Sequence, residues 1–193
     1  MAVAVIAAAF GYWYVALAFI LLAAFMAFFF RDPRRAAPSD ENVVLSPADG
    51  RVTRVERLAP ADPQSGTIVS IFLSVFDVHI NRSPIAGEIT DVSYTKGRFV
   101  IATRADASVV NEQNALTIKN DRVTIICKQI AGVLARRIVC WKQRGDSVAL
   151  GERFGLIKFS SRTDLILPPS VDVEVVVGNR VKGGLTVIGR VRS

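Results

Sequence analysis

Few side chains in this sequence could act as a base or as a nucleophile near neutral pH. The chain of 193 residues has a single histidine, His79, and imidazole accepts and donates protons readily at that pH. Two adjacent serines, Ser160 and Ser161, follow an apolar run, and a serine hydroxyl needs a neighbouring base before it can attack a carbonyl. Asp49, in a Pro-Ala-Asp-Gly turn, could hold that base in the required tautomer. Together these residues could perform acyl transfer.

Each of these residues also has an ordinary structural explanation. A lone histidine is commonly a hydrogen-bonded structural residue, aspartate is frequent in turns for conformational reasons, and the serine pair lacks the Gly-x-Ser-x-Gly elbow of hydrolases. Two cysteines, Cys127 and Cys140, cannot build a disulfide framework, and no spacing is typical of a metal site. We therefore expect no metal and a reducing, cytoplasmic setting.

Residues 1–30 carry no charge, so all 24 basic and 17 acidic side chains follow them. As one helix this segment would be about 45 Å long, which exceeds the thickness of a bilayer core. One tilted span, a span over residues 15–30 with residues 12–14 at the interface, or a re-entrant hairpin turning at Gly11 all fit. A secretory signal peptide fits less well, because no basic segment begins the chain and no cleavage site precedes the first charges. We expect a membrane-embedded helix or helical hairpin.

A basic cluster, Arg31, Arg34 and Arg35, follows the apolar segment directly. The positive-inside rule then predicts that the rest of the chain lies on the cytoplasmic face of the cell membrane. The net charge of +7 suits an anionic membrane surface as partner. We expect no nucleic-acid partner, because the aromatic residues after residue 30 are not clustered with basic ones.

After a basic and polar linker at residues 31–42, residues 43–193 are expected to form one β domain. Short β-branched runs separated by turn signals predict strands at residues 43–45, 50–55, 67–73, 87–94, 116–119, 123–130, 135–141, 156–159, 171–177 and 185–192. No stretch keeps a helical period, so the domain is predicted to be mainly β, a sandwich or barrel. Residues 145–155 are similar to the hairpins of lipoyl-type barrel-sandwich modules.

Taken together, several ordered motifs resemble the short-form (archaeal-type) phosphatidylserine decarboxylase family along nearly the whole chain. The matching runs are Phe29-Phe30-Arg31-Asp32-Pro33, Ser46-Pro47-Ala48-Asp49-Gly50, Asp77-Val78-His79-Ile80-Asn81-Arg82, Asn111-Glu112-Gln113-Asn114, Gln129-Ile130-Ala131-Gly132, Ala135-Arg136-Arg137-Ile138, Gly151-Glu152-Arg153-Phe154-Gly155-Leu156-Ile157-Lys158-Phe159 and Ser161-Arg162-Thr163-Asp164.

The resemblance implies a proenzyme that cuts itself between Ser160 and Ser161 and converts Ser161 into a covalent pyruvoyl group. Chains 1–160 and 161–193 would remain together as a heterodimer, and the substrate would be phosphatidylserine in the membrane, decarboxylated to phosphatidylethanolamine. Asp49, His79 and Ser161 would be the catalytic residues, with His79 also returning a proton to carbon. Ser160 stands where the family usually has glycine, so Ser160 remains an alternative nucleophile, although the run after Ser161 favours Ser161.

Two non-catalytic functions remain as alternatives at this point. A membrane-tethered barrel-sandwich adaptor would use the 145–155 hairpin, although no lysine stands at its tip to carry a prosthetic group. A lipid-binding relative that does not process itself would follow if Ser160 blocked the cut. The sequence does not distinguish a diacyl from an archaeal ether lipid, and it does not give the oligomeric state.

Overall fold

The computed structural model describes residues 2–3, 5, 11–59, 61–62, 65–102, 104, 106–133, 137–158 and 161–192. The chain divides into two compact units, Met1–Pro33 and Arg34–Ser193. Residues 31–42, the predicted linker, contain no helix or strand.

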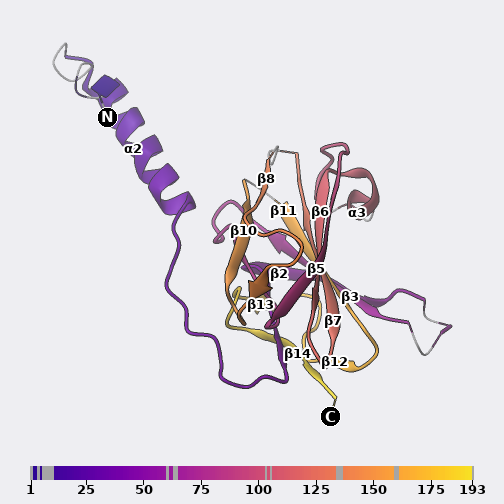
Figure 1. Ribbon diagram of the computed structural model, residues 1–193. Coiled ribbons are helices and arrows are strands. Elements are labelled where there is room, and N and C mark those ends of the chain that lie inside the picture. The colour runs from indigo at the N-terminus through magenta and orange to yellow at the C-terminus, as the bar shows by residue number, and fades with distance from the viewer. Residues whose placement is uncertain are drawn as a thin grey trace. The chain divides into compact units, whose positions relative to one another are not determined.

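Among its described residues, the N-terminal unit contains the helix α2 (Trp13–Phe29), in which every residue is apolar or aromatic (Figure 1). Most of its large side chains are exposed, Trp13 and Leu21 among them. Within the described ranges, no helix combines the length and the apolar character needed to cross a bilayer. Residues 6–10, on which the predicted choice between a single span and a hairpin at Gly11 depends, lie outside the described residues.

The second unit is built from short strands and one helical turn, α3 (Ala107–Val110). The strands are β1 (Val43–Leu45), β2 (Gly50–Arg57), β3 (Thr67–Leu73), β4 (Ile80–Arg82), β5 (Gly87–Thr95), β6 (Gln113–Lys119), β7 (Thr124–Ile130), β8 (Ile138–Cys140), β9 (Ser147–Val148), β10 (Arg153–Ile157), β11 (Ser161–Leu167), β12 (Val171–Val173), β13 (Arg180–Val181) and β14 (Val187–Val191). The prediction of a mainly β domain is confirmed.

The strands form three sheets. The largest has eight strands in the order β13-β2-β3-β11-β7-β6-β5-β9, and the two three-stranded sheets have the orders β1-β14-β12 and β4-β10-β8. Strand β11 pairs antiparallel with β3 on one side and with β7 on the other. The large sheet is strongly twisted around this central region (Figure 1).

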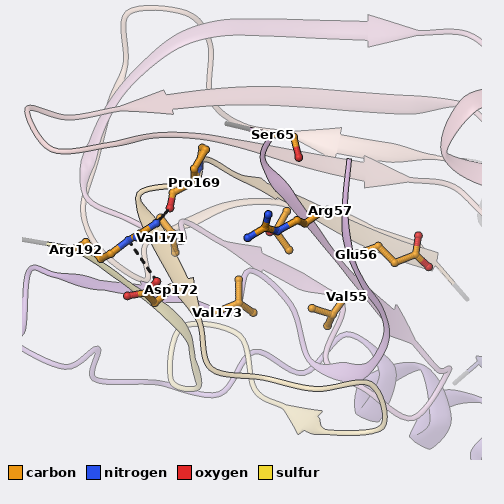
Figure 2. A pocket seen from close by; sticks show the side chains of 10 residues that line it. Val55, Glu56, Arg57, Ser65, Pro169, Val171, Asp172, Val173 and Arg192 are labelled. Atoms are coloured by element: carbon orange, nitrogen blue, oxygen red, sulfur yellow. Dashed lines mark hydrogen bonds and ion pairs between the residues drawn. The ribbon is translucent and has the colours of Figure 1, made fainter. Parts of the chain in front are cut away.

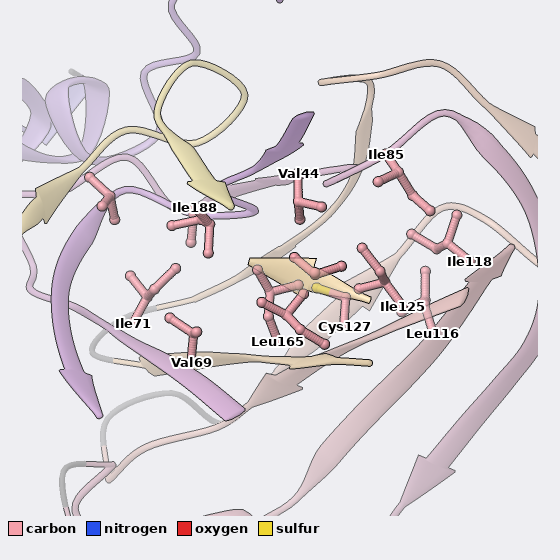
Figure 3. Close-up of a cluster of buried hydrophobic side chains, with 14 of the residues drawn as sticks. Val44, Val69, Ile71, Ile85, Leu116, Ile118, Ile125, Cys127, Leu165 and Ile188 are labelled. Atoms are coloured by element: carbon pink, nitrogen blue, oxygen red, sulfur yellow. The ribbon is translucent and has the colours of Figure 1, made fainter. Parts of the chain in front are cut away.

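The hydrophobic core lies between the large sheet and the sheet that contains β1 and β14. Strand β6 shows the expected alternation, with every second side chain buried, because successive residues of a strand point to opposite faces. Val69, Cys127 and Leu165 from three neighbouring strands meet Val44 and Ile188 from the small sheet (Figure 3). Strand β11 is different, because six of its seven residues are buried. The central strand is therefore covered on both faces.

Strands β4, β11 and β13 were not predicted, and a predicted hairpin does not form. Strand β11 was not predicted, because Ser161-Arg162-Thr163-Asp164 places four polar residues in succession and hides the apolar alternation of a strand. The hairpin predicted for residues 145–155 is wrong, since β9 pairs with β5 whereas β10 pairs with β4 and β8. The turn before β10 carries the chain from one sheet into another, and Gly151 there has a φ of +73°.

We expect Leu165→Ala to destabilise the domain by about 2–5 kcal/mol, because the side chain is fully buried between β3 and β7 and its removal leaves a cavity. Urea unfolding of the full chain in detergent, followed by circular dichroism, measures this change. The neighbouring Ile166 is only partly buried, so Ile166→Ala is the matched control and should cost less. Equal losses would contradict the assignment of the core face.

Candidate active site

Ser161 is the first residue of β11 and pairs with Leu73 of β3. Its side chain is fully buried, and its Oγ has no hydrogen-bond partner among the described residues. A buried hydroxyl without a partner is costly, so such groups are rare and often have a chemical role. Ser160, the other half of the predicted cleavage site, lies outside the described residues, so the position of the cut stays a prediction.

His79 is buried just before β4, and its orientation is fixed by a backbone carbonyl. Its Nδ1 lies 2.9 Å from the main-chain oxygen of Asp77. A carbonyl oxygen can only accept a hydrogen bond, so Nδ1 carries the proton, and in the neutral ring Nε2 then has the lone pair. The basic atom of the imidazole is therefore Nε2.

The turn that provides this carbonyl is itself held by the carboxylate of Asp77. The backbone N–H and the hydroxyl of Ser74 donate to Asp77 Oδ2 at 2.8 and 2.7 Å, and Arg180 donates to Oδ1 at 3.1 Å. Ser74 directly follows Leu73, the residue that pairs with Ser161. The turn that orients His79 therefore starts from the strand beside Ser161.

Two contacts bring His79 and the start of β11 into the same region of the domain. The N–H of Ile157, the last residue of β10, donates to the carbonyl of His79 at 3.3 Å. Ser161 follows Ile157 by four residues, which span at most about 14 Å. Asn81 donates to Thr163 Oγ1 at 3.1 Å, and these two residues lie two positions after His79 and Ser161.

A buried amide network joins β4 to the large sheet at this point. Asn114 of β6 donates to Gln129 of β7 at 3.0 Å, Gln129 donates to Asn81 at 2.9 Å, and Asn81 donates to Thr163 of β11. Sequence reasoning included these residues in motifs but gave them no role. The sequence signal was that these residues are polar at strand positions whose side chains, by alternation, are expected to face the interior.

Asp49 has different partners from those expected. The guanidinium of Arg35 binds both carboxylate oxygens, at 2.5 and 2.8 Å, and the N–H of Gly183 donates to Oδ1 at 2.8 Å. Arg35 also donates to the carbonyl of Gly183 at 2.6 Å. This two-pronged, largely buried pair anchors the chain after Pro33 to the β domain. The orienting role of Asp49 toward His79 stays a prediction, and Asp77 supplies the contact that orients the ring here.

The residues after Ser161 are held by a buried ion pair. Arg162 Nε lies 2.8 Å from Asp164 Oδ1, and Arg162 Nη1 donates to the carbonyls of Ala102 and Arg104, both at 3.1 Å. Removing one partner from such a pair leaves an uncompensated buried charge, which is strongly destabilising. The pair therefore fixes the start of β11 and ties the loop around Ala102 to it.

The buried cysteine, Cys127, does not compete with serine as a nucleophile. Cys127 and Cys140 are free thiols, and burial, followed by the negative charge of Asp164, raises the pKa of the Cys127 thiol. Cys127 therefore stays protonated at neutral pH, in the unreactive form. Within the described ranges, no three His, Cys, Asp or Glu side chains are grouped so that they could hold a metal ion.

Comparison with known proteins decides the family. The family model described as phosphatidylserine decarboxylase matches residues 22–189. The chain belongs to the phosphatidylserine decarboxylase family. A phosphatidylserine decarboxylase proenzyme of Solibacter usitatus is 50% identical over 91% of this chain and 83% of the relative. The proenzyme of that name from Carboxydothermus hydrogenoformans is 44% identical over 98% of this chain and 90% of the relative.

These relatives strengthen the case for the site described above. The family match includes Asp49, His79 and Ser161 within one continuous region. The word proenzyme in the names of the relatives denotes a precursor that must be processed. A buried, partnerless serine hydroxyl at the head of the central strand is the feature of this chain that best suits such processing.

The predicted role of Asp49 can be separated from its anchoring role. Asp49→Asn and Arg35→Gln each break the same largely buried pair, so we expect similar destabilisation, about 3–5 kcal/mol. Self-cleavage should be lost in Asp49→Asn and kept in Arg35→Gln at a temperature at which both variants are folded. Gel analysis over time measures the two rates, and equal rates would exclude a direct role of the carboxylate.

Proposed function

We propose that this chain is a self-processing, pyruvoyl-dependent decarboxylase that converts phosphatidylserine to phosphatidylethanolamine in phospholipid biosynthesis. The observation that carries the proposal is the buried, partnerless Oγ of Ser161, at the end of β11 to which the chain path also brings His79. Membership of the phosphatidylserine decarboxylase family supplies the substrate class.

The cut would begin at Ser161, with His79 Nε2 as the base that removes the hydroxyl proton. Ser161 Oγ adds to the carbonyl carbon of residue 160, and the peptide C–N bond breaks to leave an ester. The ester then leaves by elimination across the Cα–Cβ bond of residue 161, which releases the carboxylate end of chain 1–160. Water hydrolyses the resulting dehydroalanine to a pyruvoyl group and ammonia.

Position 161 fits such a group. The residue is fully buried, and its side-chain oxygen has no hydrogen-bond partner among the described residues. Conversion of the serine would therefore break no hydrogen bond there. The backbone of residue 161 is held by pairing with Leu73. When present, the pyruvoyl carbonyl would bind the substrate amine covalently and accept the electron pair that departing CO₂ leaves behind. His79 Nε2, once protonated, would then give a proton to the substrate carbon from which CO₂ departed.

The sheet topology supports a heterodimer after cleavage. Chain 161–193 would contain β11, which pairs with β3 and β7, as well as β13, which pairs with β2, and β14, which pairs with β1. Each of those partner strands belongs to chain 1–160. The two products are therefore expected to remain one folded body, held by backbone hydrogen bonds and by the shared core.

A location at the cytoplasmic face of the cell membrane is part of the proposal. Support comes from the all-apolar sequence of α2, its exposed large side chains and the arginines that follow it. A diacyl lipid does not leave the bilayer readily, so an enzyme that acts on its headgroup benefits from attachment to the membrane. The alternative of a barrel-sandwich adaptor loses its basis, because the 145–155 hairpin does not form.

Replacing the nucleophile should leave the chain whole. We expect Ser161→Ala to give a single chain of 21.0 kDa by intact-mass analysis, whereas the parent gives two chains, the smaller lacking a free amino group at its N-terminus. Ser160→Ala is the matched control and should still be cut, because residue 160 contributes only its carbonyl. Cutting in Ser161→Ala but not in Ser160→Ala would move the nucleophile to Ser160. An uncut parent that is active in membranes would reject the proposal.

Removing the proposed base should slow the cut without unfolding the chain. We expect His79→Ala to cleave itself at least about a hundredfold more slowly, the contribution typical of a general base. Circular dichroism and the urea midpoint serve as controls for folding. A folded His79→Ala chain that cuts itself at the parental rate would remove His79 from maturation.

A further inference from the structure

Three aliphatic side chains project into solvent near the start of β11. They are Ile101, Val109 and Val133, which are 58%, 77% and 46% exposed. We propose that this apolar tip inserts into the surface of an anionic bilayer and so holds the site around Ser161 against the membrane. The inference rests on the proposed decarboxylase function and adds to it the surface through which the β domain reaches its lipid substrate.

The register of the large sheet places the apolar tip. Arg162, the second residue of β11, pairs with Ile130 at the end of β7, and Ile130 pairs with Gln113 at the start of β6. Gln113 pairs in turn with Thr95 at the end of β5. The apolar tip belongs to the segments that join β5 to β6 and β7 to β8, and α3 and the start of β8 lie at the same end of the β domain (Figure 1). The three side chains therefore lie at the end of the sheet where β11 begins.

Buried polar groups fix the backbone on both sides of Ile101. The side chain of Asn111 is fully buried, and its Nδ2 donates to the carbonyl of Val100 at 2.8 Å while its Oδ1 accepts from the N–H of Val100 at 2.9 Å. On the other side, the buried Arg162 donates to the carbonyl of Ala102 at 3.1 Å. Ala102 is buried as well. Ile101 is therefore the exposed residue of a backbone that is held at both ends.

The same asparagine joins the two segments that carry the apolar tip. Asn111 Nδ2 also donates to the carbonyl of Ala131 at 2.7 Å, two residues before Val133. Asn111 directly follows α3, the helical turn that contains Val109. A second, smaller apolar cluster lies at this place and contains Phe99, Ala131, Ile138 and Ile157. The apolar tip therefore stands on one connected support and not on two independent loops.

An apolar surface of this kind requires a partner. Single exposed aliphatic residues are common on soluble proteins and need no explanation. Several of them on one fixed support indicate a surface that is covered by another protein or by a membrane. The charge around the apolar tip and the substrate of the neighbouring site both favour the membrane.

The segments that carry the apolar tip have an excess of positive charge. Residues 96–112 and 131–137 contain five basic and two acidic side chains. One of the acids, Asp106, is paired with Arg104 at 3.0 Å. Basic side chains around inserted apolar ones are typical of proteins that bind anionic lipid surfaces. Three exposed basic residues form no ion pair within the described part of the chain: Lys96, Arg98 and Arg137.

The substrate of the family is the second reason to favour a bilayer. Phosphatidylserine is a lipid whose acyl chains stay in the membrane, so a site that acts on its headgroup lies at the membrane surface. Arg162 directly follows Ser161 and holds the carbonyl of Ala102 beside Ile101. Insertion of the apolar tip would therefore bring Ser161 to the surface in which the headgroups lie.

The opposite end of the large sheet has a different surface. Thr67 pairs there with Leu167, the last residue of β11, and lines a pocket of about 330 Å³. Two guanidinium groups in this pocket are matched by two carboxylates, so the pocket has no excess charge. Leu58, the residue after Arg57, is 50% exposed and provides a comparison for the apolar tip. Figure 2 shows the charged side chains of the pocket, which are Glu56, Arg57, Asp172 and Arg192.

Tryptophan fluorescence in vesicles tests the insertion with the full chain. Ile101→Trp and Val109→Trp each place an indole in the apolar tip, and Leu58→Trp is the matched control at the opposite end of the sheet. The vesicles contain phosphatidylglycerol, which is anionic, and phosphatidylcholine that carries bromine atoms on its acyl chains and quenches an indole inside the bilayer. The parent chain gives the background from Trp13 and Trp141.

We expect bromine to quench about half or more of the emission added at residues 101 and 109, because side chains at an interfacial site reach about 5–10 Å into the boundary between headgroups and acyl chains. The emission added at residue 58 should be the same with and without bromine. In vesicles that contain phosphatidylserine, Ile101→Asn combined with Val109→Asn should raise the KM about tenfold, because two apolar contacts with the bilayer are lost. Leu58→Asn should leave the KM unchanged.

Absence of quenching at residues 101 and 109 in folded chains would overturn the inference and would leave a protein as the occupant of the apolar tip. Quenching at residue 58 equal to that at residue 101 would overturn it as well, since the membrane would then contact the domain without preference for this end. An unchanged KM in the double variant would likewise reject it. Circular dichroism checks folding, and Val133→Trp replaces either reporter if that variant is unfolded.

The quenching needs no turnover, so it can be measured equally in a Ser161→Ala chain. A parent chain that releases no CO₂ from phosphatidylserine would therefore count against the proposed function, whereas the quenching tests the apolar tip separately.

Discussion

The structure depends on one constraint, namely that polar residues at the head of a strand buried on both faces must find partners inside the protein. Water cannot satisfy the groups at the start of β11, so Arg162 is paired with Asp164 and Thr163 is joined to Asn81. Each partner fixes a different part of the surroundings, the loop around Ala102 in one case and strand β4 in the other. Ser161 is the exception, because its buried Oγ has no hydrogen-bond partner among the described residues.

The same constraint explains why strands of two separate sheets hold one site. Asn81 belongs to the β4 sheet, whereas Gln129 and Thr163 belong to the large sheet. Their amide and hydroxyl groups supply directional contacts where apolar packing would leave the register of the short strand β4 loosely defined. His79, two residues before Asn81, takes its position from this attachment and from the turn held by Asp77.

The sequence predicted the mainly β fold and most strand positions, because β-branched runs are local signals. It missed β11, since a run of buried polar residues looks like a loop until their partners are known. It did not assign Asp77 to His79, because the contact uses a main-chain carbonyl, which side-chain identity does not report. The pairing of Arg35 with Asp49, across an extended segment, likewise has no signature in residue spacing.

The central place of β11 also sets an order of events. Residues 161–193 supply an interior strand of the largest sheet together with two strands of the β1-β14-β12 sheet. The proposed catalytic site would therefore form only after this segment has packed into the fold. With the proposed cut before residue 161, folding would therefore precede maturation, and an unbroken polypeptide would favour assembly. A chain divided from the outset would face the additional entropic cost of recruiting its own middle strand from solution.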